Sequence, residues 1–338
     1  MSRPKAGFLG VGWIGRSRME GMLATGAIEA AAIVEPSPEM REGALALAPG
    51  AQVCSSYEEM LALGLDGIVI ATPSALHAEQ SIRALESGAA VFCQKPLGRN
   101  AGETAAVVAA ARAADRLLAV DLSYRRTAAV EAIRPLIEAK ALGKIQFVDL
   151  TFHNAYGPDK PWFYDKALSG GGCLIDLGVH LVDLALWFLD WPEVVDVSAS
   201  LFAEGSALVS PDAVEDLAIA TLRTHDNVVI RIACSWRLNA GQDAIIEARF
   251  YGSEGGAGFH NLNGSFLDFG SERWQGTQRE CLATPPDAWS ARSAEDWARR
   301  LALGSRFDPR ALELTTVSAV LDRIYRSAIR STPIACPS

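Results

Sequence analysis

The sequence predicts an α/β protein of two domains, the first built on a doubly wound parallel sheet and the second on a mostly antiparallel sheet. The chain has 338 residues, more than a single hydrophobic core usually accommodates. Up to about residue 122, short apolar runs alternate with helical segments, which is typical of parallel strands joined by crossover helices. Beyond it, extended segments follow one another without helices between them, which indicates antiparallel pairing. We therefore expect domains at 1–122 and 123–338.

The elements of the first domain are predicted from apolar runs and helical spacing. The strand candidates have little polar alternation, as in a sheet covered on both faces; they are AGFLG, AAIVE, DGIVIA, AAVFC and RLLAVDL. The helix candidates between them are 19–25, 38–47, 57–63, 75–87 and 102–114.

In the second domain, helices are expected over 127–141 and 309–330, and the second of these is expected to pack back near the first domain. Between them lie long extended segments bounded by turn residues. These strand candidates are KIQFVDLTFHNAY, VVDVSASLFA, AVEDLAIATLR, NVVIRIACSWRL and AIIEARFYG.

Composition and charge restrict the class of function. Hydrophobic residues make up 49% of the chain and charged residues 21%, which is typical of a globular protein. The 31 basic and 40 acidic residues give a net charge of −9, so no nucleic-acid partner is expected. We find no signal-peptide pattern and no apolar run long enough to cross a bilayer, so we expect a cytoplasmic protein without a membrane partner.

The cysteines are widely spaced, with no CxxC motif and no cysteine–histidine cluster, so no metal site is expected. We interpret all six as reduced thiols; they are Cys54, Cys93, Cys173, Cys234, Cys281 and Cys336. Cys173 adjoins a motif described below, but no neighbouring cation in the sequence would stabilise its thiolate. A catalytic cysteine is therefore not expected.

The residues GVGWIG connect the first strand candidate to a helical segment, which is the position of a dinucleotide-binding turn in a Rossmann domain. Gly10 permits the tight turn, Gly12 lets the backbone approach a pyrophosphate, and Gly15 allows close packing of helix on strand. Trp13 and Ile14 complete the loop, and the N-terminus of the helix favours an anion.

Glu35 ends the next strand candidate, where its carboxylate can accept hydrogen bonds from the adenosine ribose. A carboxylate there repels a ribose phosphate, so we expect NAD as the cofactor and regard NADP as less favoured. Arg41 is near enough in the sequence to weaken this preference. The alternative is that the glycines only shape a turn and Glu35 is a solvated strand end.

A second loop follows the strand candidate DGIVIA. Thr72, Pro73 and Ser74, with His77 beyond them, are candidate cofactor contacts, because the carboxyl ends of parallel strands face the cofactor crevice. A helix-capping role for Ser74, with His77 in the first helical turn, explains the same residues almost as well.

Lys95 and Pro96 follow the strand candidate AAVFC, so the lysine is expected at the same edge of the sheet. A lysine there can meet both the nicotinamide ribose and the substrate and can act in acid–base chemistry. The alternative is an exposed loop lysine, the commonest environment of this residue type.

The segment from Ser169 to His180 reads SGGGCLIDLGVH and precedes an apolar helical run. Asp176 and His180 are four residues apart, so on a helix they share one face. A neutral imidazole is suited to take the proton of a hydroxyl group that loses hydride, and Asp176 can orient it. The glycines indicate close approach of the backbone to a ligand. An Asp–His pair that only satisfies itself is the alternative.

Taken together, these motifs resemble the glucose-fructose oxidoreductase, inositol dehydrogenase and MocA-like family over nearly the whole chain. The resemblance is carried by GVGWIG, Glu35, ATPSALH, the KP dipeptide at Lys95 and Pro96, and GGGCLIDLGVH, in the family's order and approximate spacing. It implies that Lys95, Asp176 and His180 are catalytic. It also implies an open antiparallel sheet in the second domain, through which a homodimer or homotetramer would form.

One departure from the family matters, because the family usually has glutamate before the KP dipeptide and this chain has Gln94. The loss of that carboxylate makes activity less assured without threatening the fold. The resemblance also suggests substrate contacts, since a polyhydroxylated ring needs an aromatic face and hydrogen-bond partners. These candidates are Tyr124, Arg125, His153, Asn154 and Trp162. A structural role explains each of them at least as well.

The expected activity is hydride transfer between nicotinamide and a carbinol carbon of a sugar, sugar derivative or cyclitol. His180 would take the hydroxyl proton, Lys95 would stabilise the reacting oxygen, and Asp176 would fix His180 or a neighbouring hydroxyl. Three alternatives stay open. They are a glycoside hydrolase or lyase that uses NAD transiently, a nonenzymatic NAD-binding regulator, and a dehydrogenase for another alcohol, an imine or a biliverdin-like ring.

Overall fold

The computed structural model of the chain describes residues 2–208, 210 and 212–331, so Cys336 lies outside the described residues. Two compact units divide the chain. Unit 1 comprises the chain up to Ser123 together with Ala291–Thr316, and unit 2 comprises Tyr124–Ser290 together with the chain from Val317.

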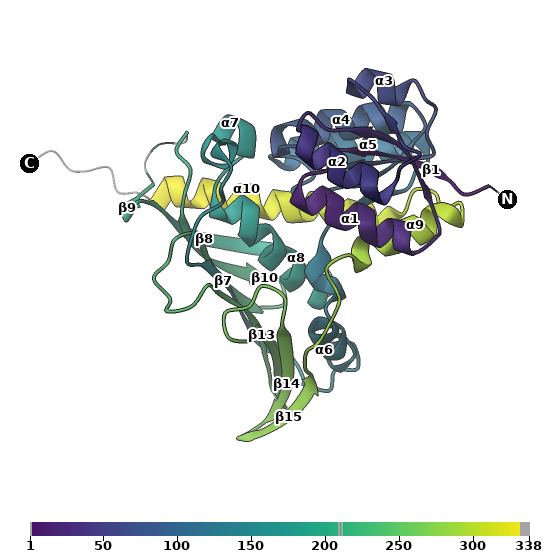
Figure 1. Ribbon diagram of the computed structural model, residues 1–338. Helices are drawn as coiled ribbons and strands as arrows, with labels where there is room; N and C mark the ends of the chain where they lie inside the picture. The colour runs from purple at the N-terminus through teal and green to yellow at the C-terminus, as the bar shows by residue number, and fades with distance from the viewer. Residues whose placement is uncertain (1, 209, 211, 332–338) are drawn as a thin grey trace, which may run out of the picture. The chain divides into compact units, whose positions relative to one another are not determined.

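Unit 1 contains a six-stranded parallel sheet with the order β3-β2-β1-β4-β5-β6. In Figure 1 the part of this unit before residue 123 is coloured purple to blue, and α9 is yellow-green. The order reverses at β1 and β4, and in such sheets ligands bind beyond the carboxyl ends of the strands at this switch point. The strands are β1 (Lys5–Leu9), β2 (Glu29–Val34), β3 (Gln52–Val53), β4 (Gly67–Ile70), β5 (Ala90–Cys93) and β6 (Leu118–Val120).

Helices cover both faces of this sheet, as the apolar strands predict. Residues of α1, α2 and α9 share a buried cluster with one set of strand side chains, and residues of α3, α4 and α5 share a second cluster with the alternate set. The bounds are α1 (Trp13–Ala24), α2 (Pro38–Leu47), α3 (Tyr57–Leu61), α4 (Ser74–Glu86), α5 (Ala101–Ala114) and α9 (Arg292–Ala302).

The expected second domain of 123–338 is wrong over residues 291–316, which belong to unit 1. The reason is the packing of α9, whose fully buried Trp297 lies 5.9 Å from Phe92 of β5, centroid to centroid. Gly67 of β4 provides the space, since a Cβ there would come within 2.7 Å of the Trp297 ring. A helix far along the chain therefore completes the first core.

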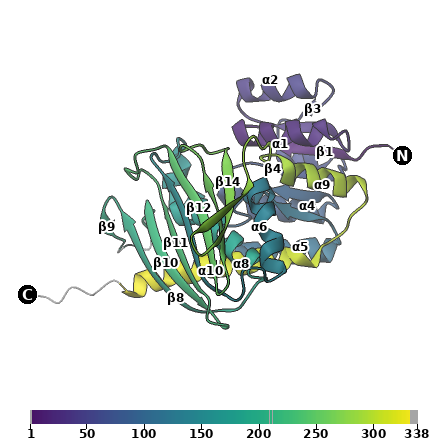
Figure 2. The same cartoon turned by 90° about the horizontal axis from the view of Figure 1, so that it is seen from below.

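Unit 2 is built on a nine-stranded sheet with the order β15-β14-β13-β12-β7-β11-β10-β8-β9, in which β7 and β11 pair in parallel and the other neighbouring strands pair antiparallel. Figure 2 shows strands of this sheet side by side. A mostly antiparallel sheet was expected, and this is confirmed. The strands are β7 (Ile145–Asn154), β8 (Val194–Ala203), β9 (Ser206–Ala207), β10 (Leu217–Thr224), β11 (Val229–Ser235), β12 (Ala244–Gly252), β13 (Gly256–Asn261), β14 (Phe269–Gln275) and β15 (Gln278–Ala283).

One face of this sheet, which we call the core face, is covered by helices. They include α6 (Ala128–Glu138), the π-helical turn η3 (Leu174–Gly178), α8 (Val179–Phe188) and the part of α10 (Leu312–Ser331) from Val317 onward. Short turns precede η3, namely η2 (Pro161–Tyr164) and α7 (Lys166–Ser169). The opposite face, which we call the outer face, carries polar and aromatic side chains.

The stretch Lys166–Phe188 is long and apolar enough to cross a membrane by length and composition. The sequence expectation that no segment reaches this length overlooked it. However, 89% of its most apolar window is buried inside the protein, as in the core helix of a soluble protein. We therefore treat it as a core element of unit 2.

Candidate active site

The glycine loop of unit 1 has the geometry that the sequence predicts for a dinucleotide turn. Gly10 adopts a φ of +83°, and a Cβ there would lie 2.6 Å from the carbonyl oxygen of Ala71. A Cβ on Gly15 would lie 2.2 Å from the carbonyl oxygen of Gly10, so this glycine lets α1 pack against the strand end. At Gly12 a Cβ would meet no atom within 4 Å, so the approach to this part of the loop is open.

Glu35 is tied to the glycine loop by its carboxylate. One oxygen accepts a hydrogen bond from the backbone N–H of Val11 at 2.8 Å, and the other accepts one from Ser37 at 3.0 Å. The helix α1 starts without a side-chain cap, which leaves its first N–H groups for an anion. A carboxylate beside the loop and an uncapped helix start are the groups that hold a ribose and a pyrophosphate. The residues present therefore fit a dinucleotide.

His77, a predicted cofactor contact, is buried and lies against two backbone carbonyl groups. The side chain is 1% exposed, and its two ring nitrogens lie 2.6 Å from the carbonyl oxygen of Pro96 and 2.7 Å from that of Thr72. Burial lowers the pKa of His77, the two carbonyl contacts oppose this, and Lys95 lowers the pKa further. Burial is the largest of these effects, so the net change is a lowered pKa. His77 thus links the loops after β4 and β5.

The other candidate cofactor contacts differ in the exposure of their side chains. The Thr72 hydroxyl donates to Oε1 of Gln80 at 2.6 Å, and Ser74 is only 4% exposed. Trp13 is 74% exposed at the start of α1. Of the cofactor candidates tested by burial, Trp13 presents a free surface, whereas Ser74 and His77 serve mainly the local structure.

In unit 2, the predicted pair Asp176 and His180 lies on one helical segment. Asp176 belongs to the π-helical turn η3 and His180 to α8, which continues from it. Such turns are frequent at functional sites, because the extra residue redirects side chains. The His180 ring is 6% exposed and packs edge-on against Tyr124, with 4.8 Å between centroids. Lys95, the third predicted catalytic residue, belongs to unit 1.

Trp236 is a site residue that sequence reasoning missed. Its indole Nε1 donates a hydrogen bond to Oδ2 of Asp176 at 3.1 Å, which fixes the carboxylate. The ring of Phe163 lies edge-on to Trp236, and Trp162 stacks on Phe163 at 3.8 Å. Trp162, a predicted substrate contact, therefore belongs to an aromatic cluster that ends at Asp176.

Packing restricts two glycines of the GGGC motif, for which the sequence suggested close approach to a ligand. A Cβ on Gly172 would lie 1.8 Å from the carbonyl oxygen of Glu215, and one on Gly171 would lie 2.0 Å from the Tyr325 hydroxyl. Oε1 of Glu215 accepts hydrogen bonds from the backbone of Gly172 and Leu174 and from the Tyr325 hydroxyl, at 3.0, 2.9 and 2.7 Å. Glu215 thus anchors the start of the helical segment that carries Asp176 and His180.

We expect Glu215 to make the stability of unit 2 depend on pH. The side chain is fully buried, and burial raises its pKa although Tyr325 and the backbone donors oppose the rise. The folded state therefore holds the proton more tightly than the unfolded state, so stability falls as pH rises from the ordinary pKa to the raised one. We expect Glu215→Gln to remove this dependence. The difference in unfolding free energy between wild type and Glu215→Gln should decrease over this interval. The decrease should be about 1.4 kcal/mol for each unit by which the pKa of Glu215 is raised.

This prediction is measured by urea unfolding of both proteins at a series of pH values from about 4 to 8. The control is Glu280→Gln, which changes an exposed glutamate on the edge strand β15. If the difference between wild type and Glu215→Gln stays constant over the whole series, the pH role of Glu215 is wrong.

Arg125, a predicted substrate contact, is held by an acidic and an aromatic environment. Its guanidinium forms a bidentate ion pair with the buried Asp183, with N–O distances of 2.7 and 2.5 Å. Its Cζ also lies 5.5 Å from the Trp187 ring and 5.3 Å from the Trp191 ring. Burial raises the pKa of Asp183 and Arg125 opposes the rise, so the arginine is needed to hold the buried acid.

His153 and Asn154 end β7 and differ in what they offer. Nδ1 of His153 lies 2.8 Å from the Ser235 hydroxyl, and burial, followed by Arg231, lowers the pKa of the ring. Consecutive strand residues point to opposite faces, and Phe152 contacts His180, so His153 points away from it. Within the described chain, Oδ1 of Asn154 is buried without a hydrogen-bond partner, so it stays a candidate ligand acceptor.

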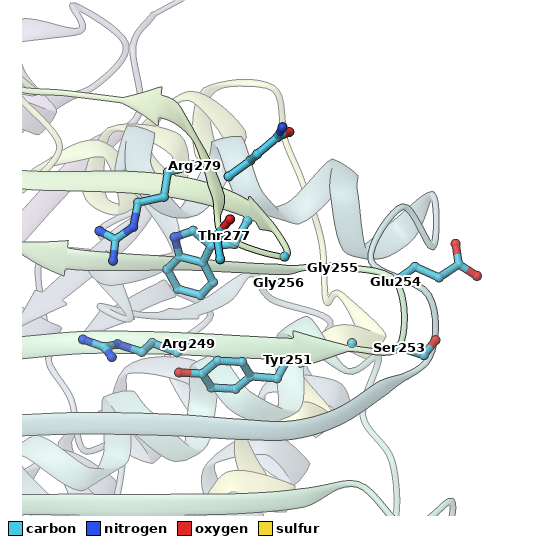
Figure 3. Close-up of a pocket in the computed structure, with 12 residues that line it drawn as sticks. Arg249, Tyr251, Ser253, Glu254, Gly255, Gly256, Thr277 and Arg279 are labelled. Atoms are coloured by element: carbon cyan, nitrogen blue, oxygen red, sulfur yellow. The ribbon is translucent and has the colours of Figure 1, made fainter.

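A cavity of about 710 Å³ opens on the outer face of the unit 2 sheet and contains none of the predicted catalytic residues (Figure 3). Arg249, Tyr251 and Arg279 line it together with Trp274. Tyr251 continues an aromatic stack, with ring centroids 5.6 Å from Phe147 and 6.1 Å from Trp274. This cavity is therefore a feature of the outer face and not of the candidate active site.

Among the described ranges of the chain, no group of three or more His, Cys, Asp or Glu side chains could hold a metal ion. The five cysteines within those ranges are free thiols, and the four buried ones are Cys54, Cys93, Cys173 and Cys234. Burial is the main cause that raises the pKa of Cys173. The thiol therefore stays protonated, as expected for a packing residue.

A dinucleotide turn in one unit and an Asp–His helix in the other define a nucleotide-dependent enzyme class, and comparison with known proteins agrees. Residues 5–122 match the oxidoreductase family with an NAD-binding Rossmann fold, and residues 130–257 match the GFO/IDH/MocA C-terminal domain. The chain belongs to the GFO/IDH/MocA family of oxidoreductases.

Two relatives illustrate the extent of the similarity. The chain is 31% identical over 279 residues to a putative UDP-kanosamine synthase oxidoreductase subunit of Amycolatopsis mediterranei (strain S699), a match that covers 78% of this chain and 75% of that protein. It is 28% identical over 209 residues to the D-glucoside 3-dehydrogenase of Escherichia coli (strain K12), and this match covers 59% of this chain. That match spans only 60% of the length of the Escherichia coli protein.

Solved structures show the same fold. A levoglucosan dehydrogenase in complex with NADH and levoglucosan superposes with a TM-score of 0.82 at 22% sequence identity, over 97% of this chain and 98% of that one. Other structures of this fold are described as complexes with NAD and with NADP. The similarity confirms the predicted α/β fold and leaves the choice between the two cofactors open.

Proposed function

We propose that this protein is an NAD-dependent oxidoreductase that acts on a carbinol carbon of a sugar, sugar derivative or cyclitol. The main support for the proposal is the anchored helical segment of unit 2. In this segment Asp176 accepts a hydrogen bond from the Trp236 indole, and His180 follows one turn further on. The names of relatives that act on glucosides and inositol support the substrate class. When bound, the nicotinamide supplies the hydride acceptor or donor.

The side chains of the protein then handle the proton and the charge. His180 takes the proton of the reacting hydroxyl at a ring nitrogen, and Asp176 orients His180 or holds a neighbouring hydroxyl. Lys95 donates a hydrogen bond to the reacting oxygen and stabilises the negative charge that develops there. The reverse reduction uses the same contacts.

The preference for NAD over NADP rests on Glu35. Its carboxylate lies beside the glycine loop, where it favours ribose hydroxyls and opposes a phosphate. Arg41 donates to the carbonyl oxygen of Glu35 at 3.1 Å, so its guanidinium is held by the backbone beside that acid. We therefore regard the carboxylate as the dominant charge at this position.

The experiment that tests the function is the formation of reduced cofactor, followed by absorbance at about pH 8, with a panel of aldoses, sugar acids and inositols. NAD and NADP are compared for each substrate. We expect turnover of one substrate class, with NAD preferred. If NAD binds but no substrate of the panel yields reduced cofactor, the dehydrogenase proposal is rejected for these substrates. A hydrolase, lyase or regulator would then be favoured.

We also propose that the outer face of the unit 2 sheet forms the contact of a homodimer or homotetramer. The face combines the stack of Phe147, Tyr251 and Trp274 with an ion pair between Arg231 and Asp149 at 2.6 Å. Tyr251 is exposed and the other two rings are half-buried, and aromatic side chains beside paired charges suit a self-complementary interface. Light scattering of the purified protein measures the mass, and a monomer at all concentrations would reject the proposal.

A further inference from the structure

The residue before Lys95 is held by side chains that no sequence motif singled out. Nε2 of Gln94 donates a hydrogen bond to Oδ2 of Asp121 at 2.8 Å. The same oxygen accepts a hydrogen bond from Nε of Arg18 in α1 at 2.6 Å. Asp121 follows β6, which pairs in parallel with β5, so the carboxylate lies at the strand end beside Gln94. Arg18, Asp121 and Gln94 thus form a polar chain that ends next to Lys95.

The ion pair in this polar chain is buried, Gln94 is half-buried, and the three side chains are balanced in charge. The side chains of Arg18 and Asp121 are 6% and 1% exposed. A buried ion pair is tolerated when each charge is compensated, and it becomes strongly destabilising when one charge is left over. The amide of Gln94 adds a donor without adding a charge, so the chain stays neutral.

A glutamate at position 94 would be incompatible with Asp121. It would place a carboxylate oxygen against Oδ2 of Asp121 in the position where the Gln94 amide donates at 2.8 Å. Two acceptors would then face each other, and the buried group would carry one uncompensated negative charge. The site therefore accommodates a single carboxylate, on β5 or after β6.

The residue after Lys95 is also fixed. The carbonyl oxygen of Pro96 lies 2.6 Å from Nδ1 of His77, whose Nε2 lies 2.7 Å from the carbonyl oxygen of Thr72. Lys95 is thus placed between two anchored neighbours, Gln94 on the Asp121 side and Pro96 on the His77 side. A change in either anchor is transmitted to the lysine backbone.

We propose that Asp121, held by Arg18, is a positioning residue for Lys95 and replaces the carboxylate that the family usually has at position 94. Gln94 is the neutral partner that this arrangement requires. The inference rests on the proposed function, because that function gives Lys95 its contact with cofactor and substrate.

The first test is Gln94→Glu, with Gln52→Glu as a matched control. Gln52 also donates to a carboxylate, Oε1 of Glu59 at 3.2 Å, but this pair is exposed. We expect Gln94→Glu to lower the melting temperature by about 5 °C or more and Gln52→Glu to change it by about 1 °C at most. Equal melting temperatures of the two variants would overturn the proposal.

The second test restores the charge balance in Gln94→Glu/Asp121→Asn. The introduced carboxylate lies near Arg18, because both native donors reach the same oxygen. The double variant is expected to regain at least half of the melting temperature lost by Gln94→Glu. A double variant less stable than both single variants would show that charge balance does not govern this site.

The third test asks whether the effect passes through Lys95, and it uses NADH binding measured by fluorescence. We expect Gln94→Glu to weaken NADH binding about fivefold in the wild-type background and less than twofold in the Lys95→Ala background. Equal weakening in both backgrounds would reject a role through Lys95. This measurement needs no turnover. A protein that is inactive on the substrate panel, but in which the effect of Gln94→Glu on NADH binding depends on Lys95, would contradict the proposed function and leave this inference intact.

Discussion

Lys95→Ala is expected to lower kcat/KM for the substrate found in the panel by about a hundredfold to ten-thousandfold, the range typical of a lost catalytic proton or charge contact. The loss should appear mainly in kcat, because the developing charge on the reacting oxygen is stabilised most in the transition state. Steady-state rates at saturating NAD measure both constants. The melting temperature should change little, since the anchors of this turn are Gln94 and Pro96.

The control for this prediction is Lys5→Ala, which removes an exposed lysine at the start of β1. We expect its rate constants to match those of the wild type within about twofold, as for most exposed substitutions. A loss of less than tenfold in Lys95→Ala, with folding intact, would remove Lys95 from the catalytic residues. The proton and charge roles would then fall to His180 alone.

The sequence predicted the elements of the first domain well where local pattern decides. The expected helix 38–47 coincides with α2, and the run AAVFC contains β5. The expected helix 19–25 begins too late, because α1 already starts at Trp13, inside the glycine motif. Periodicity is weak there, since Gly15 and the polar residues from Arg16 to Arg18 separate Ile14 from Met19.

The sequence did not predict the elements that depend on tertiary packing. The strand β13 begins at Gly256 and contains Gly258, residues of low strand propensity that are required because the Trp274 ring lies over both. The helix α9 has a clear amphipathic pattern, but its partner strand β5 lies about 200 residues earlier. No local rule connects such distant segments.

The candidate site shows the same limit. The spacing of Asp176 and His180 pointed to one helical face, yet their supports came from elsewhere in the chain. Glu215 reaches Gly172 across 43 residues, and Tyr325 reaches Glu215 across 110 residues. A buried glutamate is a possible signal for such a role, because carboxylates are seldom buried without partners. Its burial, however, is not visible in the strand candidate AVEDLAIATLR, where a second acid, Asp216, directly follows Glu215.

Gly172→Ala is expected to destabilise unit 2 by about 4 kcal/mol or more, the largest effect on stability that we predict. A Cβ there would lie 1.8 Å from the carbonyl oxygen of Glu215 and 2.9 Å from its backbone nitrogen, and neither atom can move without shifting the chain. The shift would break the hydrogen bonds from Gly172 and Leu174 to the Glu215 carboxylate. Urea unfolding followed by tryptophan fluorescence measures the loss, since Trp236 lies in this unit.

The comparison variant Gly171→Ala separates backbone overlap from side-chain overlap at adjacent glycines. Its Cβ would lie 2.0 Å from the Tyr325 hydroxyl, which is the end of a side chain and can rotate away at the loss of one hydrogen bond. We therefore expect a smaller cost, about 1–3 kcal/mol. Gly12→Ala provides the baseline of about 1 kcal/mol or less, since a Cβ there would meet no atom within 4 Å. If Gly172→Ala proved as stable as Gly12→Ala, Glu215 would not anchor the helical segment of Asp176 and His180, and the glycines would again be candidates for ligand contact.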